Sequence, residues 1–262
     1  MIEIDGREAE TLLAFVTGRS IAHVRAYAEV PLDDAVLARF NELAARRKNG
    51  EPLEYLVGSA GFYYREFLVD PRVLIPRPET EHLVEDAIAH LQAYDAPRVL
   101  DLGTGSGAIA LTIAAEVPAA RVDGVDVSPD AIIVAIANRE RLDLSKRVDF
   151  YLGDLLQPVA RKRYDAIVAN LPYVPAADIG VDLRFEPPLA LDGGADGLDV
   201  YRRFFAAAPA ALRPGGLLLA EGAPPVGAGL LALAQAAFAQ ATVALERDYG
   251  GRERYVKVLT PA

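Results

Sequence analysis

The chain has 262 residues, which is enough for one large domain or for a domain with a smaller appendage. A hydrophobic fraction of 52% with 24% charged residues is typical of a globular protein with a substantial core. The formal charge of −10 disfavours a long nucleic-acid track, so direct nucleic-acid binding is not expected, and a protein or small-molecule partner is the default.

Residue counts also disfavour several kinds of site. The sequence has no cysteine, which excludes disulfides, thiolate zinc sites and cysteine nucleophiles, and its three histidines make a histidine-rich metal site improbable, so we expect no metal. No apolar run reaches the roughly 18 residues of a membrane span, and no basic-then-apolar leader opens the chain. We therefore expect a cytoplasmic protein without a membrane partner.

Residues 1–54 are predicted to form a small helical domain. Apolar residues recur there at helical spacing in two groups, Leu12, Leu13, Phe15, Val16 and Val36, Leu37, Phe40, Leu43. A helix-start signal at 31–34 and a basic, glycine-ended stop at 48–50 bound the second group. The domain either caps the next one or docks a macromolecular substrate.

Residues 55–75 are predicted to form a β-hairpin linker, because glycines and Asp70-Pro71 punctuate the aromatic-rich run 62–69. The segment 75–81, Ile-Pro-Arg-Pro-Glu-Thr-Glu, follows. Its two prolines hold Arg77 extended, and the acidic residues after them suit the first turn of a helix. A plain helix entry would look the same.

Residues 76–262 are predicted to form a doubly wound α/β domain. Strands are expected at 98–102, 121–126, 147–152, 164–170 and 216–221, with helices at 107–117, 129–142, 198–212 and 226–240. Two further strands, 242–249 and 252–260, are joined by Gly250-Gly251 and should form a C-terminal antiparallel hairpin.

The first chemical motif is Asp-Leu-Gly-Thr-Gly-Ser-Gly at 101–107, where a strand turns into a helix. Glycines let the backbone turn sharply and let a ligand approach beside the positive end of a helix. Gly103, Gly105 and Ala108 also fit the dinucleotide-binding pattern, so a nicotinamide enzyme stays open at this point. Asp126 ends the next strand at the spacing of an acid that binds ribose hydroxyls.

Asp101 helps to distinguish a dinucleotide from other nucleoside ligands. A carboxylate directly before the loop suits a ligand with an ammonium group and would repel a pyrophosphate. S-adenosylmethionine has that ammonium group, a sulfonium and a ribose. Asp154 and Leu155 follow the third strand, where an adenine amine could be bound. Each acid could instead only cap the helix after it.

The segment Asn170-Leu171-Pro172-Tyr173 leaves the strand 164–170 at its carboxyl end, where ligands bind in open α/β sheets. The Asn170 carboxamide oxygen and the Leu171 carbonyl can accept both N–H groups of a planar amide or arylamine, on which Tyr173 can stack. Two acceptors polarise the nitrogen and align it with a sulfonium methyl, so catalysis would be orientation with electrostatic support.

With these motifs the chain resembles the release-factor glutamine methyltransferases, the HemK/PrmC proteins. The resemblance covers the helical module, segment 75–81, the glycine loop, Asn170 to Tyr173, Glu-Pro-Pro-Leu-Ala-Leu at 186–191 and the terminal hairpin with Gly-Arg-Glu-Arg at 251–254. It implies a class I methyltransferase sheet and methylation of the glutamine amide in the Gly-Gly-Gln motif of peptide-chain release factors, with S-adenosylmethionine as cofactor.

The resemblance implies cofactor contacts at 103–107, Asp126, Leu155 and Asn170 and a substrate held by 170–173, and Asp101 and Asp154 are added for their charge. Cofactor binding is expected of Asp101, Gly103, Thr104, Gly105, Ser106, Gly107, Asp126, Asp154, Leu155 and Asn170. Catalysis and substrate binding are expected of Asn170, Leu171, Pro172 and Tyr173, with Arg77 as a further substrate contact.

The chain departs from the family pattern at two positions. Leu171 replaces the first proline of Asn-Pro-Pro-Tyr, which keeps the backbone acceptor but loses the fixed φ of proline. Leu155 stands where relatives can carry an aromatic residue against adenine, so apolar contact would replace stacking there.

Three alternatives follow. Asn-Leu-Pro-Tyr also resembles the motif of ribosomal-RNA adenine dimethyltransferases, so adenine methylation in RNA or DNA is the nearest rival; it would be expected to show a basic face and a helical extension after the sheet. A non-catalytic protein-binding paralogue would keep the fold and fail to bind cofactor. A nicotinamide dehydrogenase has no use for Asn-Leu-Pro-Tyr.

Overall fold

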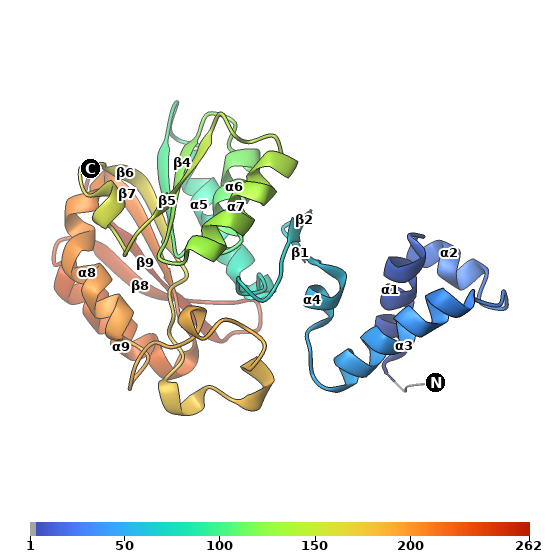
Figure 1. The fold of residues 1–262 in the computed structure, drawn as a ribbon. Helices are drawn as coiled ribbons and strands as arrows, with labels where there is room; N and C mark the ends of the chain where they lie inside the picture. Colours follow the sequence, from blue (N-terminus) through green and yellow to red (C-terminus); the bar gives the residue numbers. More distant parts are fainter. Residues whose placement is uncertain (1–3) are drawn as a thin grey trace.

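The computed structural model describes residues 4–262, so positions 1–3 of the predicted helical domain lie outside the described residues. From the N-terminus the chain forms a group of helices, a small hairpin and a larger α/β part (Figure 1). Over the described range no helix is long and apolar enough to cross a membrane.

The N-terminal part is helical, as the apolar spacing predicts. Its helices are α1 (Gly6–Thr17), α2 (Ile21–Ala26), α3 (Asp34–Lys48) and α4 (Leu53–Val57). The side chains of Asp5 and Asp33 accept hydrogen bonds from backbone N–H groups at the starts of α1 and α3, which stabilises those ends. Leu12, Leu43 and Leu56 are buried together in a small core. Helix α4 spans the position at which the domain boundary was predicted.

The predicted hairpin is present. Strands β1 (Ser59–Phe62) and β2 (Arg65–Leu68) pair antiparallel, and Tyr63 and Tyr64 between them have φ values of 45° and 60°. Two positive φ values in a two-residue loop match the twist of a tight hairpin. The carboxamide of Asn138 bonds both backbone groups of Leu68, at 2.7 and 3.0 Å, and so attaches the hairpin to the α/β part.

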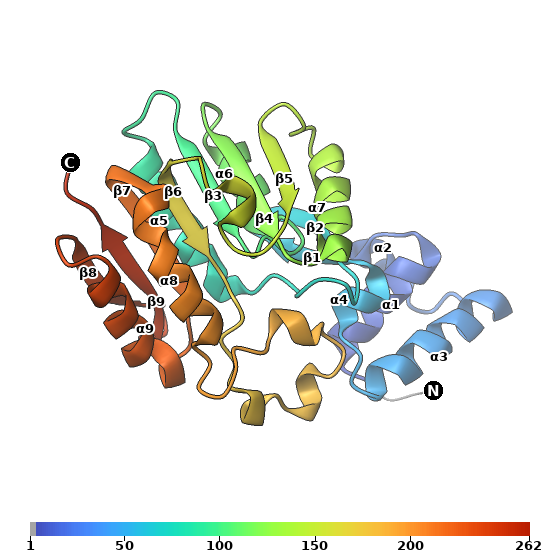
Figure 2. The same ribbon diagram turned by 60° about the vertical axis from the view of Figure 1, so that its left-hand side comes forward.

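The α/β part contains one seven-stranded sheet in the order β5-β4-β3-β6-β7-β9-β8 (Figure 2). Its first five strands in sequence are parallel: β3 (Arg98–Leu102), β4 (Arg121–Asp126), β5 (Val148–Leu152), β6 (Tyr164–Ala169) and β7 (Leu212–Glu221). The strands β8 (Thr242–Arg247) and β9 (Glu253–Leu259) are antiparallel, which confirms the predicted C-terminal hairpin.

Helices cover both faces of the sheet, because its strands alternate apolar side chains between two cores. On β6, Ile167 packs into the core that α8 (Asp199–Ala211) and α9 (Pro224–Ala237) cover. Val168 packs into the opposite core, under α5 (Glu81–Leu91) and α6 (Ala108–Glu116). Helix α7 (Pro129–Arg141) lies beside α6 near β5 (Figure 2). The doubly wound prediction is confirmed.

Strand β7 and the short 3₁₀ turns differ from the sequence prediction, and helix α9 (Pro224–Ala237) begins and ends two to three residues before the predicted 226–240. Strand β7 begins at Leu212, before the predicted start at Gly216, with a register shift against β6 and with Gly215 at φ 71°. Short 3₁₀ turns, which the sequence did not predict, punctuate the chain before α5 and after β5 and β6: η1 (Pro78–Thr80), η2 (Gln157–Val159), η3 (Ala176–Asp178), η4 (Val181–Leu183) and η5 (Pro188–Ala190).

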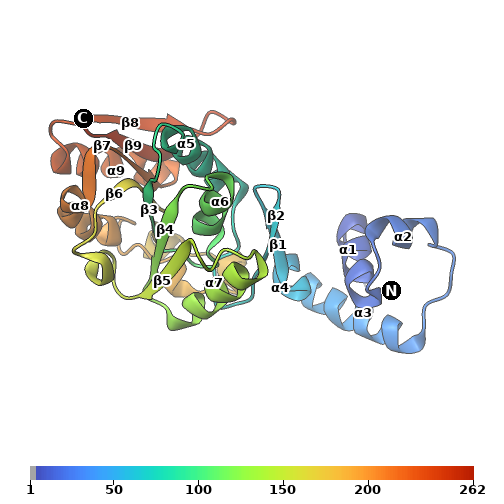
Figure 3. The ribbon, with the colours of Figure 1, turned by 90° about the horizontal axis from the view of Figure 1, so that it is seen from above.

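The chain after β6 forms a long loop at the carboxyl ends of the strands. Val174 bridges Asp192, and its backbone bonds Leu191 and Gly193 at 2.9 Å, so the loop closes at its base. Seen from above in Figure 3, α1–α3 lie to one side of the α/β part, with α4 and the β1–β2 hairpin between them. This loop and the hairpin linker therefore border the carboxyl ends of the parallel strands.

Candidate active site

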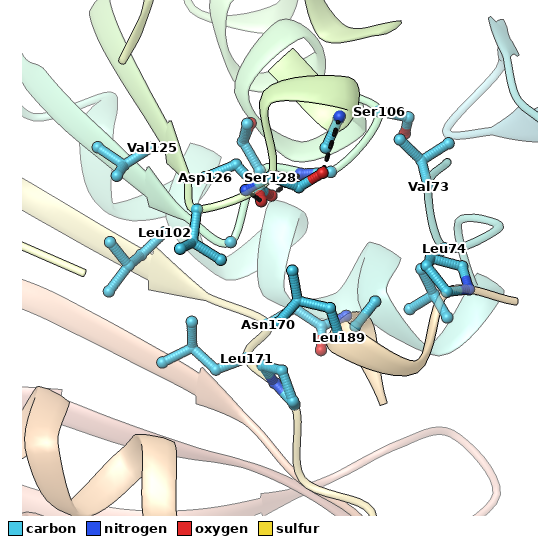
Figure 4. Close-up of a pocket in the computed structure, with 18 of the residues that line it drawn as sticks. Val73, Leu74, Leu102, Ser106, Val125, Asp126, Ser128, Asn170, Leu171 and Leu189 are labelled. Atoms are coloured by element: carbon cyan, nitrogen blue, oxygen red, sulfur yellow. Dashed lines mark hydrogen bonds between the residues drawn. The ribbon is translucent and has the colours of Figure 1, made fainter. Parts of the chain in front are cut away.

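A cavity of about 280 Å³ lies at the carboxyl ends of the central parallel strands. Its walls come from the loops after β3, β4, β5 and β6, from segment 72–80 and from residues 187–192. Figure 4 shows Asp126 and Ser128 on one side of the cavity and Asn170 with Leu189 on the other. The reversal of strand order between β3 and β6 places it where doubly wound sheets bind ligands.

The glycine loop forms one wall and requires its glycines. Gly103 and Gly105 have φ values of 75° and 54°, a region in which side chains with a Cβ are strained. The N–H groups of Gly103 and Thr104 both donate to the Val125 carbonyl, at 2.9 and 3.0 Å. A Cβ on Gly103 would lie 3.0 Å from the Asn170 carbonyl oxygen. The loop and the Asn170 segment are thus in direct contact.

Asp126 fixes the same loop from the end of β4. Its Oδ2 accepts from the Gly105 N–H at 2.8 Å and its Oδ1 from the Ser128 N–H at 2.9 Å. Burial raises the pKa of Asp126, and these backbone bonds oppose the rise. Each carboxylate oxygen has a second lone pair, so the side chain can still accept from hydroxyls in the cavity that it lines.

Asp101 differs from the expectation for it, because it does not line the cavity. The residue is fully buried, and its Oδ2 accepts from the Thr104 hydroxyl at 2.6 Å and from the Ala110 N–H at 3.0 Å. Its Oδ1 has no hydrogen-bond partner within residues 4–262, and burial raises the pKa to about 7. The carboxyl group fastens the loop to α6, which the sequence left open as the alternative to ammonium binding.

Asp154 and Leu155 line the cavity after β5, as predicted. Leu155 has a φ of 49°. Asp154 forms an ion pair with Arg203 of α8, which also lines the cavity. Gly107, in contrast, lies behind the loop, where a Cβ would meet Leu111 and Phe150 at 3.1 Å. Its role is close packing of α6 on the sheet.

Asn170 leaves β6 facing the cavity. Its amide Nδ2 donates to the Thr80 hydroxyl at 3.3 Å. Thr80 is buried in η1, at the end of the segment that carries Arg77. With the NH₂ group directed at Thr80, the carboxamide oxygen is the acceptor left for a ligand.

The three residues after Asn170 have different surroundings. Leu171 and Pro172 line the cavity, and the Leu171 N–H donates to the Tyr201 hydroxyl at 3.2 Å. Tyr173 is not among the residues that line the cavity: its ring packs against the core under α8, and its hydroxyl lies 3.4 Å from Glu221 Oε1. The expected stacking of Tyr173 on a substrate is therefore absent from this arrangement.

Arg77 joins segment 75–81 to segment 186–191. It lines the cavity and forms an ion pair with Glu186, a residue that is only 5% exposed and whose carboxylate also accepts from the Ile75 N–H at 3.2 Å. A buried carboxylate needs such partners, because an unpaired one is costly. The pair ties segment 75–81 to the loop after β6.

The structure brings most of the predicted residues to one cavity. Its lining includes Arg77, Gly103, Thr104, Gly105, Ser106, Asp126, Asp154, Leu155, Asn170, Leu171 and Pro172, and it excludes Asp101, Gly107 and Tyr173. Sequence reasoning missed Thr80 and Glu221. Glu221 ends a parallel strand next to β6, and an acidic residue at that position was a signal that could have found it. Within the described residues no group of acids or histidines is arranged to hold a metal.

The cavity fits S-adenosylmethionine. Gly103 and Gly105 let a ligand approach the loop backbone between Thr104 and Ser106, acids stand at the end of β4 and after β5, and the walls between them are apolar, including Leu102 and Val125. A cation that carries a ribose and an adenine matches these acidic groups and apolar walls.

Solved structures share the fold. A ribosomal protein L11 methylase from Lactobacillus delbrueckii subsp. bulgaricus is 18% identical, with a TM-score of 0.52 over 73% of this chain and 82% of that one. A SAM-dependent methyltransferase from Agrobacterium tumefaciens is 19% identical, with a TM-score of 0.52 over 78% of this chain and 70% of that one. At these identities the likeness concerns the fold alone.

Sequence comparisons are more specific. Residues 85–224 match the family described as methyltransferase small domain, and residues 1–58 match the PrmC N-terminal domain. Release factor glutamine methyltransferases from Moorella thermoacetica and Bordetella pertussis are 43% and 44% identical over 94% of this chain, and the matches cover 88% and 92% of those proteins. The one from Salmonella typhimurium is 40% identical over 95% of this chain and 90% of its own length. The chain therefore belongs to the release factor glutamine methyltransferase family.

Proposed function

We propose that this protein transfers a methyl group from S-adenosylmethionine to the side-chain amide nitrogen of the glutamine in the Gly-Gly-Gln motif of peptide-chain release factors. The observation that carries the proposal is the position of Asn170, which lines the cavity beside the glycine loop with its NH₂ group turned to Thr80. The family membership, shared over 94% of the chain, supports the same reaction.

Cofactor binding is assigned to the walls around the glycine loop. Gly103 to Ser106 would hold the amino-acid end, Asp126 the ribose hydroxyls, and Asp154 with Leu155 the adenine. When bound, S-adenosylmethionine supplies a methyl group on a positively charged sulfur. Asp101 and Gly107 support this site from behind, by fastening and packing the loop.

Substrate binding is assigned to Asn170 and Leu171. A glutamine amide nitrogen is a weak nucleophile because its lone pair is delocalised into the carbonyl. The carboxamide oxygen of Asn170 and the carbonyl of Leu171 accept the two N–H bonds, which raises electron density on the nitrogen and fixes its direction. As the N–CH₃ bond forms, the methyl–sulfur bond breaks, and the resulting N-protonated methylamide is acidic enough to lose its extra proton to water. Orientation of the amide therefore suffices without a tuned general base. Pro172 holds the turn, and Arg77 with the loop after β6 borders the entrance for the peptide.

The described N-terminal helices have a surface suited to a protein substrate. Phe15, Tyr27, Val30 and Leu37 are large apolar residues exposed on α1, α3 and the chain between α2 and α3. Where such residues are contiguous on a surface, they mark protein-interaction sites. We propose residues 1–54 as the docking domain for the release factor, residues 55–75 as the linker, residues 76–262 as the catalytic domain, and the cytoplasm as the compartment.

A labelled-methyl assay tests the proposed function. Purified protein is offered a release factor, the same factor with the Gly-Gly-Gln glutamine replaced by glutamate, and ribosomal RNA, each with labelled S-adenosylmethionine. We expect label in the unmodified factor alone. Equal labelling of the glutamate variant would overturn the substrate assignment, and label in the RNA alone would favour the adenine methyltransferase instead.

A further inference from the structure

Glu221, at the end of β7, lies directly behind the Asn170 segment. Ala169 of β6 pairs with Ala220 of β7, so the residues that follow each of them are neighbours. The side chain of Glu221 is 1% exposed and does not line the cavity. The reaction as described above assigns it no role.

Two tyrosines connect Glu221 to the segment. The Tyr173 hydroxyl donates to Glu221 Oε1 at 3.4 Å. The Tyr201 hydroxyl donates to the Glu221 backbone carbonyl at 2.5 Å and accepts from the Leu171 N–H at 3.2 Å. Both ends of the turn that presents the Leu171 carbonyl are therefore tied to the same residue.

Thr80 makes the connection to Asn170. Its hydroxyl accepts from Asn170 Nδ2 at 3.3 Å. The Thr80 side chain also lowers the pKa of the buried Glu221 carboxyl, which places its hydroxyl next to that group. A hydroxyl has a single proton to donate. When that proton is given to the carboxylate, only lone pairs remain for Asn170. The amide must then turn its NH₂ group to Thr80 and its oxygen to the cavity.

Opposing effects act on the pKa of the Glu221 carboxyl group. Burial raises its pKa from 4.5 to about 7, while bonds from Thr80 and Tyr173 and the charge of Arg254 on β9 oppose the rise. Glu79 of η1 adds repulsion, and Glu221 Oε2 has no partner among residues 4–262. The carboxylate thus changes charge near neutral pH, in contact with the groups that orient Asn170.

We propose, on the basis of the methyl-transfer function above, that Glu221 is a positioning residue that acts through Thr80 and Tyr173 to hold the Asn170 oxygen and the Leu171 carbonyl toward the substrate amide. It touches neither substrate nor cofactor. Its effect should appear in turnover and not in cofactor binding, because the cofactor walls are made by other loops.

The Thr80 hydroxyl is tested by a matched pair of substitutions. Thr80→Val keeps the shape and removes the acceptor for Asn170, so kcat on a release factor should fall about tenfold, as expected for one hydrogen bond. Thr80→Ser keeps the hydroxyl and should restore kcat to within about twofold of the unsubstituted protein. The affinity for S-adenosylhomocysteine, measured by calorimetry, should stay unchanged in both variants.

The charge is tested by Glu221→Gln with Glu246→Gln of β8 as the control. Ionised Glu221 is the stronger acceptor, so kcat of the unsubstituted protein should rise with pH through about 7. Glu221→Gln should lack this rise and match the low-pH kcat of the unsubstituted protein at every pH. Glu246→Gln should keep it. In the double variant Thr80→Val/Glu221→Gln the two losses should not add if Glu221 acts through Thr80 as proposed, and fully additive losses would contradict that route.

The outcomes separate the two proposals. If the unsubstituted protein does not methylate a release factor, the proposed function fails. If it does, an unchanged kcat and pH profile in Glu221→Gln overturns the positioning role. Equal losses in Thr80→Val and Thr80→Ser overturn it too, and this pair decides the matter if Glu221→Gln does not fold.

Discussion

At the scale of single residues, the direction of the Asn170 amide decides what the site can do. A carboxamide presents a donor on one side and an acceptor on the other, and a substrate NH₂ group needs the acceptor. The contact of Asn170 Nδ2 with Thr80 assigns the donor side to the protein. The oxygen is then free to face the cavity.

Asn170→Ala should therefore remove most turnover. Loss of one oriented group that stabilises developing charge costs on the order of 10² to 10³ in kcat. The dissociation constant for S-adenosylhomocysteine should change by less than about fivefold, because the glycine loop keeps its own bonds to Val125. Steady-state kinetics and calorimetry on the same preparation measure both. A kcat within twofold of the unsubstituted protein would remove Asn170 from the mechanism.

Gly103 is the residue at which cofactor and substrate segments touch. Gly103→Ala would place a Cβ 3.0 Å from the Asn170 carbonyl oxygen and 3.2 Å from a Leu171 methyl group, on a backbone with a φ of 75°. We expect a loss of about 1–3 kcal/mol in the free energy of unfolding from the strained backbone. Cofactor affinity and kcat should both fall. Urea unfolding and calorimetry test this, and wild-type values for both would show that the loop can move without cost.

At the scale of elements, the ion pair of Arg77 and Glu186 joins segment 75–81 to the loop after β6. Arg77→Ala leaves the Glu186 carboxylate, 5% exposed, with only the Ile75 N–H as a partner. Breaking a buried pair in this way costs about 3–5 kcal/mol, although the exposure of Arg77 places this case at the lower end.

Limited proteolysis tests whether the loss of this ion pair loosens the loop after β6. In Arg77→Ala we expect faster cleavage within residues 176–190, together with a lower Tm. Arg72→Ala is the control, because Arg72 pairs with the exposed Asp70 and not with the loop. If both variants are cleaved at the wild-type rate, the pair does not hold the loop.

The elements themselves were largely predictable from sequence. The apolar run 166–169 without alternation marks β6, because both faces of this strand are covered, and glycines mark the turn into α6. The start of β7 and the short 3₁₀ turns after β6 were not, since they depend on pairing with distant residues such as Thr260 and Asp192. Local propensity does not encode those partners.

The site was predictable to the extent that it sits at strand ends. Asp126, Asn170 and the glycine loop follow strands, and parallel strands bring their carboxyl ends together. The sequence could not show that Asp101 turns inward to Thr104 or that Tyr173 turns to Glu221. The direction of a side chain after a strand is set by tertiary contacts.

At the scale of the whole molecule, two buried carboxyl groups near the sheet edge should shape stability against pH. Burial raises the pKa of Asp101 from 3.8 to about 7 and that of Glu221 from 4.5 to about 7. Between about pH 4 and 7 the folded protein therefore binds more protons than the unfolded chain. Their contribution to stability is full below the unfolded pKa values and is lost as pH rises through 7.

Asp101→Asn isolates one of these groups, because its amide cannot ionise. The free energy of unfolding of the unsubstituted protein should fall relative to the variant as pH rises from about 5 to 7, by at most about 1.4 kcal/mol per pH unit. The opposite slope expected from His90, whose pKa burial lowers, cancels in the difference. Urea unfolding across this range gives the two curves, and parallel curves would show that Asp101 titrates normally.

The most direct test of the account is a crystal structure of the protein with S-adenosylhomocysteine and a peptide that contains Gly-Gly-Gln. We expect the glutamine amide nitrogen within hydrogen-bond distance of the Asn170 carboxamide oxygen and the Leu171 carbonyl, on the side of the glycine loop that holds the cofactor. An Asn170 side chain turned away from both ligands, with the glutamine held by other groups, would contradict it.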